Sequence, residues 1–561
     1  MRIAMLLLGF LIASSAQAQV ASIIIKELDP LPGAPEGQTV AGISNTAVNH
    51  GPSYAATINS AGDAGTLSHV WGNATGGPGT VLRTEETIGI YRQDNFESFF
   101  GISTVPFEVA YSPSCTDTVS GTSGLDGVWF GDLAVAVEEQ PYPHLVGWYW
   151  SFGSRPAATA DGHPTWVGGI TDTPGGSTQN RGLFFGIAAT PLLMGDAYVG
   201  GLPDPLSRSS TVSFDYRFSA LGTHYLAEVQ TETGSSTNDN HMVSDNHVVM
   251  AGGAPVSEAG AIPVEIGGLA GEAWDNFDFV GITESGEWMF TGDTNAATDV
   301  DEIIVRNGSI IHREGDVLDG ETLSGAIEGA YMNENGDLAF IWDIVTEGGT
   351  SETLFFNGRL LLTEGDYVDV DGDFVADSNA VLDAFTGISS LTLSDRDAEG
   401  WVRIYFTADV DISVATPRLG QPLVAGGEEA GMEAGTELQP AGDPLRTVSE
   451  GYMVMRVNAG TSAVEPVAGA VHHLGIHPSV VTDAGARIRF DLPRTGSIEV
   501  GIYDLSGRLV RNLASGTRAA GGHTVRWDGR SASGEVLPAG VYLLRCCSDA
   551  GTDSRRVTLV H

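Results

Sequence analysis

The sequence contains very little cysteine and almost no lysine. Three cysteines in 561 residues are too few for a disulfide scaffold, and the adjacent Cys546 and Cys547 could form only a strained bridge with each other. Lys26 is the only lysine, and all other basic residues are arginines. Lysine and arginine together number 27 against 71 acidic residues, which gives a net charge of −44. Such a surface repels nucleic acids and anionic membranes, which argues against both as partners.

Long apolar segments are also absent. The run Ile3–Ile12 is shorter than the roughly 20 apolar residues that span a bilayer. Arg2 precedes it, and residues 16–18 (Ala-Gln-Ala) follow as a small-x-small cleavage site. This pattern predicts a signal peptide over residues 1–18, cut after Ala18, rather than an uncleaved membrane anchor. We expect an extracellular or cell-surface protein whose mature chain, from residue 19, has no transmembrane segment.

What is abundant is glycine, at 74 residues, together with 25 prolines and a hydrophobic fraction of 42%. These turn-forming residues interrupt short apolar runs along the whole chain, which is typical of an all-β protein with many turns. No His-Glu-x-x-His, Gly-x-Ser-x-Gly or phosphate-loop motif is present. Carboxylate pairs for glycoside hydrolysis cannot be picked out among so many acids.

An internal repeat organises the centre of the chain. Residues 283–290 (TESGEWMF) align with 333–340 (NENGDLAF), and 307–316 (NGSIIHREGD) align with 357–366 (NGRLLLTEGD), both at an offset of 50 residues from Gly286 to Gly336. Two motifs in one register indicate a true repeat. Weaker copies extend the repeat in both directions. The candidate turns are at Gly51, Gly162, Gly222, Gly286, Gly336 and Gly400, and a degenerate copy lies near residues 107–111.

Each repeat predicts about four short strands. Asn357-Gly358 between apolar runs predicts a hairpin that pairs 354–356 with 360–362, because a type I′ turn needs positive φ at both central residues. The Asn-x-x-Gly turn precedes a further strand, 338–342. A lone four-stranded sheet cannot cover both of its faces, so the units must stack. We predict a β-propeller of about seven blades over residues 19–460, with a linear solenoid as the alternative.

The motif Asn333-x-x-Gly336-x-x-Ala339-Phe340 resembles that of bacterial secreted proteins with tandem NxxGxxAF repeats. Those repeats often carry Glu-Gly-Asp after the hairpin, as residues 314–316 and 364–366 do here. The resemblance is sharp over about residues 280–410, and it implies no activity.

An acidic loop within the repeats is the candidate metal site. Asp369, Asp371, Asp373 and Asp377 occupy loop positions 1, 3, 5 and 9, which is the spacing of oxygen ligands in calcium loops. Phe374 stands where glycine normally makes the sharp turn, and no glutamate stands at position 12. The sequence therefore predicts Ca²⁺ binding of low affinity, and the alternative is an acidic surface loop.

From residue 478 the pattern changes to alternating strands, and a linker is expected at 461–477. Residues 527–530 (Trp-Asp-Gly-Arg) and 540–542 (Gly-Val-Tyr) resemble the FlgD-type Ig-like module, which is close to the C-terminal type A sorting domains of type IX-secreted proteins. The resemblance covers 478–561 and implies a small β-sandwich, with Trp527 in its core, that serves export or attachment to the cell envelope.

Together these features favour a non-catalytic binding, structural or adhesive protein, and a glycan or a protein is the expected ligand. A secreted hydrolase or lyase that acts on polysaccharide is the alternative, and it would place carboxylates on the strands that face a central channel.

Overall fold

The structure is a computed structural model that describes residues 20–48, 53–232, 238–346, 348–377, 379–386, 390–413, 446–459, 472–477, 480–481, 486–492, 496–504, 508–518, 521–548 and 551–559. Over these residues the protein is all-β, which confirms the predicted class, and the one helical element is the 3-10 turn η1 (Val264–Ile266). The helical structure in these ranges is too short to cross a membrane. The predicted signal peptide and the Gly51 turn lie outside the described residues.

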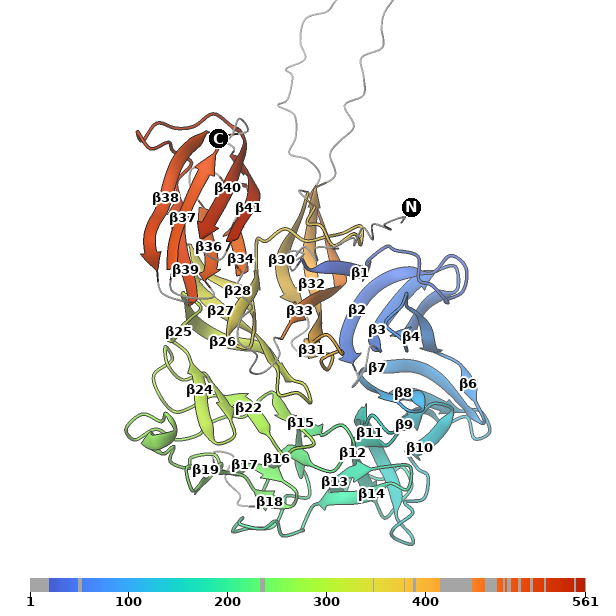
Figure 1. Cartoon of the computed structure of the whole chain (residues 1–561). Coiled ribbons are helices and arrows are strands. Elements are labelled where there is room, and N and C mark those ends of the chain that lie inside the picture. The colour runs from blue at the N-terminus through green and yellow to red at the C-terminus, as the bar shows by residue number, and fades with distance from the viewer. Residues whose placement is uncertain are drawn as a thin grey trace, which may run out of the picture.

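Six antiparallel sheets follow one another along the described chain, and a seventh completes the series (Figure 1). Sheet 1 contains β2 (Thr39–Val48), β3 (Tyr54–Gly62), β4 (Gly65–Asn73) and β5 (Thr80–Thr84), and sheet 2 contains β6 (Thr87–Ile88), β7 (Tyr91–Thr104), β8 (Phe107–Asp117), β9 (Ser123–Phe130) and β10 (Leu133–Val137). Sheet 3 contains β11 (Tyr149–Ala158), β12 (Pro164–Thr171), β13 (Asn180–Phe185) and β14 (Thr190–Met194), and sheet 4 contains β15 (Val212–Phe218), β16 (Tyr225–Gln230), β17 (Asn240–Ser244) and β18 (His247–Val248). The small ladder of β19 (Met250–Ala251) and β20 (Ala254–Pro255) follows. Sheet 5 contains β21 (Val280–Ile282), β22 (Trp288–Gly292), β23 (Ile303–Arg306) and β24 (Ser309–Arg313), and sheet 6 contains β25 (Val317–Leu318), β26 (Glu321–Met332), β27 (Leu338–Thr346), β28 (Gly349–Phe356) and β29 (Arg359–Thr363).

Sheet 7 combines strands from both ends of the repeat region. Its order is β1 (Ser22–Lys26), β33 (Arg446–Asn458), β32 (Trp401–Ser413) and β30 (Ala380–Thr386), and β31 (Thr392–Leu393) also pairs with β32. Ser22 lies opposite Val454 in the antiparallel pairing of β1 with β33. The Ile43 N–H of sheet 1 donates to the Glu450 carboxylate of sheet 7 over 2.9 Å, although the two residues are 407 positions apart. Sheets 1 and 7 are therefore neighbours.

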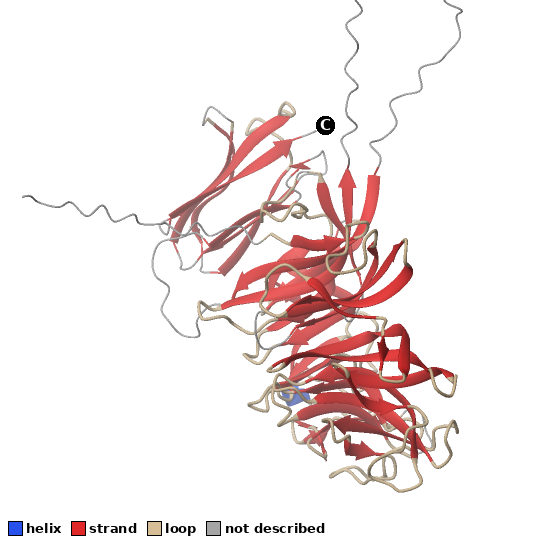
Figure 2. Ribbon diagram, turned by 90° about the vertical axis from the view of Figure 1, so that its right-hand side faces the viewer, coloured by secondary structure: helices blue, strands red, loops and turns tan. Residues whose placement is uncertain are grey.

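Most successive sheets contact one another through one strand of each. β2 contacts β7, β7 contacts β11, β15 contacts β21, β21 contacts β26, β26 contacts β31, and β31 contacts β2. Figure 2, turned by 90°, shows strands connected by loops, with a single short helical turn among the described residues. This arrangement buries both faces of a sheet between its two neighbours.

Strand β27 shows how the sequence meets that requirement. All residues from Leu338 to Trp342 are buried, and alternate side chains serve opposite neighbours. Phe340 and Trp342 pack in a core with Met289 and Ile304 of sheet 5. Ala339 and Ile341 pack in another core that includes Ile404 and Phe406 of sheet 7. An apolar run without a polar face is therefore the pattern of a strand that is covered on both sides.

Five of the predicted glycine turns share one hydrogen-bond pattern. The first residue of each turn has a side-chain oxygen that accepts a backbone N–H four or five residues later, at 2.8–3.1 Å, and the glycine has φ between 72° and 91°. These first residues are Thr159, Ser219, Thr283, Asn333 and Asp397. Hydroxyl, amide and carboxylate oxygens thus perform the same function. The degenerate copy differs, because Val105 and Pro106 form a short connection between β7 and β8.

The predicted Asn-Gly hairpins are confirmed. Asn357 and Gly358 have φ values of 49° and 74°, and Asn307 and Gly308 have 47° and 78°, as type I′ turns require. Leu354 pairs with Leu362 across the first of them. Because strands alternate in direction, both kinds of turn lie at the same end of each sheet.

The C-terminal region forms two further sheets in the described residues. One contains β34 (His472–His477), β36 (Ala486–Leu492) and β39 (Gly521–Trp527), and the other contains β35 (Val480–Val481), β41 (Gly551–Leu559), β40 (Gly540–Ser548), β37 (Gly496–Tyr503) and β38 (Leu509–Arg518). Trp527 is 1% exposed and contacts Tyr542 edge to face at 5.7 Å, in the predicted core position. β34 lies inside the stretch expected to be a linker, and its pairing with β36 places it in the C-terminal sheet.

Candidate functional site

The predicted metal loop connects sheet 6 to sheet 7 and lies against the N-terminal strand. Asp369 is fully buried, its N–H donates to the Ala21 carbonyl, and its carbonyl accepts the Ile23 N–H, each over 2.9 Å. These bonds form a parallel bridge between Ser22 and Asp369. The loop is thereby fixed at one end to the strand that completes sheet 7.

The Asp369 carboxylate shapes the loop. Its Oδ1 accepts the N–H groups of Asp371 and Gly372 over 3.0 and 2.8 Å, and its Oδ2 accepts the Phe374 N–H over 2.6 Å. Phe374 has φ of 60°, which is the left-handed conformation that glycine usually supplies at this position of a calcium loop. The missing glycine therefore does not prevent the turn.

The structure brings three of the four predicted ligands together. Carboxylate oxygens of Asp369, Asp371 and Asp373 all lie within 4.8 Å of one another. Asp377 is not part of this group, and its Oδ2 accepts the Val370 N–H over 2.9 Å. Three of the four acids chosen from the sequence spacing thus lie close together, and the spacing did not show that Asp377 closes the loop by a backbone contact.

Electrostatics differ between the buried and exposed acids of the loop. Burial raises the pKa of Asp369, but hydrogen bonds from Ser22 and from the loop N–H groups outweigh it and hold this pKa below its ordinary value. A hydrogen bond from the Asp373 N–H lowers the pKa of Asp371, whereas the charges of Asp373, Asp377 and Asp369 raise it, and the net shift is upward. Three hard oxygen donors that repel one another fit Ca²⁺, which takes oxygen ligands.

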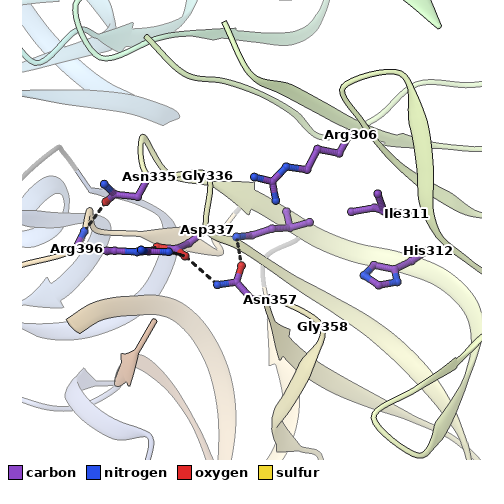
Figure 3. Close-up of a pocket in the computed structure, with 10 residues that line it drawn as sticks. Arg306, Ile311, His312, Asn335, Gly336, Asp337, Asn357, Gly358 and Arg396 are labelled. Atoms are coloured by element: carbon purple, nitrogen blue, oxygen red, sulfur yellow. Dashed lines mark hydrogen bonds and ion pairs between the residues drawn. The ribbon is translucent and has the colours of Figure 1, made fainter. Parts of the chain in front are cut away.

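A second site, which sequence reasoning missed, is a cavity of about 430 Å³ at the end of the sheets where the repeat turns lie (Figure 3). It spans three successive sheets, and it is lined by Arg306, Ile311 and His312 of sheet 5, by Asn335, Gly336, Asp337, Leu338, Asn357 and Gly358 of sheet 6, and by Arg396 ahead of β32. The repeat could have indicated this cavity. Its Asn-x-x-Gly and Asn-Gly turns lie at the same end of each sheet, so they line any gap between neighbouring sheets at that end.

The polar walls of this cavity are held by ion pairs. Arg396 donates through Nε and Nη2 to both oxygens of the buried Asp337, over 2.8 and 2.6 Å, and the Asn357 Nδ2 donates to Asp337 Oδ1 over 2.8 Å. On the facing wall, Arg306 donates to Glu287 Oε1 over 2.9 and 2.7 Å. Each guanidinium is thus neutralised by a carboxylate.

Gly336 and His312 complete the cavity. A side chain on Gly336 would place its Cβ 2.6 Å from Arg306 Nη2, so only glycine allows the guanidinium to lie against the turn. Burial lowers the pKa of His312, and its ring is therefore neutral near pH 7. The cavity offers uncharged and charge-compensated donors and acceptors, which suits a polar ligand without net charge.

Comparisons with known proteins match the C-terminal region. Residues 478–550 match the model of the FlgD Ig-like domain. No curated protein matches the chain. Among solved structures, PorZ, described as an essential surface component of the type-IX secretion system of Porphyromonas gingivalis, aligns at 10% identity and a TM-score of 0.19, over 93% of this chain and 82% of PorZ.

Two other solved structures align over large parts of this chain. A eukaryotic initiation factor aligns at 9% identity and a TM-score of 0.30, over 89% of this chain and 92% of that one. Dimeric latent PorU of Porphyromonas gingivalis aligns at 14% identity and a TM-score of 0.17, over 71% of this chain and 31% of PorU. The function proposed below rests on the residues of this chain and on the FlgD-type domain.

Proposed function

We propose that this chain is a secreted or cell-surface binding protein, with a propeller that carries the ligand site and a C-terminal module that serves export or attachment. The observation that carries the proposal is the cavity at the turn end of sheets 5, 6 and 7, because its walls are polar and are held by hydrogen bonds and ion pairs. Backbone turns and partly buried ion pairs position its hydrogen-bonding groups.

The seven sheets are proposed to form one closed ring over residues 19–460. Support comes from the pairing of β1 with β33, which adds an N-terminal strand to the last sheet. Further support comes from the contacts of β2 with β31, β32 and β33. Contact between the first and last sheets covers the two sheet faces that an open array would leave exposed.

The proposed ligand is a polar, uncharged group such as a sugar ring of a glycan. A glycan array probed with the native chain and with Ile311→Trp tests this, because Ile311 lines the cavity and is 36% exposed. Ile187→Trp is the control, since Ile187 is 53% exposed on a hairpin of sheet 3. Binding that is lost only in Ile311→Trp is expected, and equal binding by both variants would contradict the assignment of the cavity.

The C-terminal module is proposed to direct the chain to the envelope. The match over residues 478–550 and the two described sheets support an independently folded unit. Cells that express a chain ending at residue 460 should release it or retain it inside, whereas the full chain is found at the surface. Equal surface amounts of the two chains, measured by protease accessibility, would show that the module does not act in sorting.

Calcium binding by Asp369, Asp371 and Asp373 is proposed as a structural feature of the same protein. Their oxygens are close together, and the loop is hydrogen-bonded to residues 21–23. A bound Ca²⁺ would neutralise the acids and hold the N-terminal strand in sheet 7. The measurement that tests this is described in the Discussion.

One observation favours the hydrolase or lyase alternative. Asp215 in β15 is a partly buried carboxyl, and burial together with the charge of Asp278 raises its pKa to about 6 against the lowering effect of Arg155. A carboxyl with such a pKa suits general acid catalysis on a glycosidic bond. Release of reducing sugar from a polysaccharide panel by the native chain, and its loss in Asp215→Asn, would establish this activity. No release from any substrate would leave binding as the function.

A further inference from the structure

The oxygen acceptors on the side chains of the cavity already hold donors of the protein itself (Figure 3). Both oxygens of Asp337 accept N–H groups of Arg396, and Oδ1 also accepts the Asn357 Nδ2 over 2.8 Å. The Asn357 Oδ1 accepts the Leu338 N–H over 2.9 Å, and the Asn335 Oδ1 accepts the Arg396 N–H over 2.7 Å. Each carboxylate or amide oxygen of the lining is therefore engaged before a ligand arrives.

The side-chain donors of the same cavity are only partly used. Arg306 bonds to Glu287 through Nε and Nη2, and its Nη1 has no hydrogen-bond partner among the described residues. The side chain of Asn335 is exposed, and in the part of the chain that the structure describes its Nδ2 has no partner either. The cavity thus presents N–H groups that only water or a ligand can satisfy.

His312 adds one donor and one acceptor to this set. Its ring lies near that of Phe340, with the centroids 5.5 Å apart, and over the described ranges neither ring nitrogen is hydrogen-bonded. Burial lowers the pKa of His312 against the opposing charge of Asp316, so the ring is neutral near pH 7. A neutral imidazole has an N–H on one nitrogen and a lone pair on the other. Ile311, beside it on β24, contributes an apolar side chain that is 36% exposed.

A ligand that matches these groups is rich in acceptors, poor in donors and uncharged. Each arginine of the lining is already paired with a carboxylate, so an anion would gain little net attraction. A hydroxyl brings one donor with every oxygen, and the cavity has few free acceptors for it. An acetamido group instead has a carbonyl with two lone pairs, a single N–H and a methyl group. Its three parts correspond to the unpaired N–H groups, to the acceptor of His312 and to Ile311.

We propose that the cavity recognises the acetamido group of an N-acetylated sugar. The carbonyl would face the unpaired N–H groups of Arg306 and Asn335, the amide N–H would donate to His312, and the methyl would pack on Ile311. This inference rests on the proposed function, because it names the class of sugar that the cavity takes. The volume of about 430 Å³ is within the range of small-molecule pockets, roughly 300–1,000 Å³.

The test compares pairs of glycans that carry an acetamido group or a hydroxyl at the same carbon, first on an array and then by calorimetry. Asn335→Ser is the informative variant, because Ser285 occupies the corresponding position of the sheet 5 turn, 50 residues earlier. Asn295→Ser is the matched control. Asn295 is also exposed and its Oδ1 accepts the Ala273 N–H over 2.8 Å, but it does not line the cavity.

We expect the native chain to bind the acetamido member of each pair about tenfold more tightly, since a hydrogen bond that the hydroxyl glycan cannot form changes the affinity by about that factor. Asn335→Ser should lower this ratio several-fold, and Asn295→Ser should leave it unchanged. Asn335→Asp, which keeps the side-chain shape and the Oδ1 acceptor, replaces Asn335→Ser if the latter does not fold, with the same expected result.

The inference is overturned, and the glycan site kept, if both members of each pair bind equally while Ile311→Trp abolishes the binding of both. A preference for glycans that carry carboxylate or sulfate groups overturns it in the same way. An acetamido preference that Asn335→Ser leaves intact would also overturn the assignment. Binding that Ile311→Trp does not change, or no binding of any glycan, would instead contradict the proposed function and the inference together.

Discussion

Arg313 and Glu272 form a buried ion pair through two hydrogen bonds, with Nη1 to Oε1 at 2.7 Å and Nη2 to Oε2 at 2.9 Å. Their side chains are 10% and 1% exposed. The pair connects the end of β24 to the segment ahead of β21. Removal of one partner leaves the other as an uncompensated buried charge, which makes this contact sensitive to mutation.

We expect Glu272→Ala to lower the free energy of unfolding by about 3–5 kcal/mol, because Arg313 loses its only described carboxylate partner. Denaturant titration followed by tryptophan fluorescence measures this. Asp504→Ala is the control, since its partner Arg508 is 80% exposed and such a pair contributes about 1 kcal/mol or less. Equal losses in the two variants would contradict the assigned difference in burial.

We expect the stability of the protein to depend on calcium through the Asp369 loop. With a dissociation constant of about 10⁻⁴ M, as in extracellular modules, ~10 mM calcium adds about 2.7 kcal/mol to the native state. Asp371→Ala should reduce the rise in melting temperature between chelator and calcium, because it removes one of three clustered carboxylates. An unchanged rise would show that calcium does not bind to this loop.

Because five turns share one hydrogen-bond pattern, we expect different substitutions of Asn333 to lower the free energy of unfolding by different amounts. Its Oδ1 accepts the N–H groups of Asn335 and Asp337, and its Nδ2 donates to the Ser394 carbonyl over 2.9 Å. Asn333→Ala leaves these buried groups without partners and should cost about 1–3 kcal/mol of unfolding free energy. Asn333→Thr should cost less, because Thr283 performs the same acceptor function in sheet 5 without adding a charge beside Asp337. If both variants lose the same free energy, the side-chain acceptor is not what stabilises the turn.

Without calcium, stability should fall as the pH rises. Burial, the hydrogen bond with Asp293 and the surrounding acids raise the pKa of Glu302 from 4.5 to about 9, so the folded state holds a proton that the unfolded state releases. The stabilisation is complete below pH 4.5 and is lost as the pH rises towards 9. Unfolding in chelator between pH 5 and 9 should show this decline, and Glu302→Gln should flatten it. A stability that increases with pH over this range would contradict the shift.

Local patterns were enough to predict the all-β class, the Asn-Gly hairpins and the strand 338–342, because turn geometry and alternation depend on neighbouring residues. The loop around Asp369 was also predicted from spacing alone. The bridge between Ser22 and Asp369 could not be predicted in the same way, since it joins residues far apart in the sequence. The cavity depends on three sheets together, and the linker boundary depends on the pairing of His472–His477 with β36, which no local pattern specifies.

The pairing of β1 with β33 has a consequence for the order of folding. A chain that emerges with its N-terminus first presents β1 long before β33 exists, and the contact between Glu27 and Glu450 spans 423 positions. Sheets 1 to 6 can form in turn, but sheet 7 must wait until residues 446–458 have been released. Contacts of such separation close slowly, because the intervening chain has to be ordered first. Sheet 7 can therefore be completed only after nearly the whole repeat region has passed through any channel that the chain crosses.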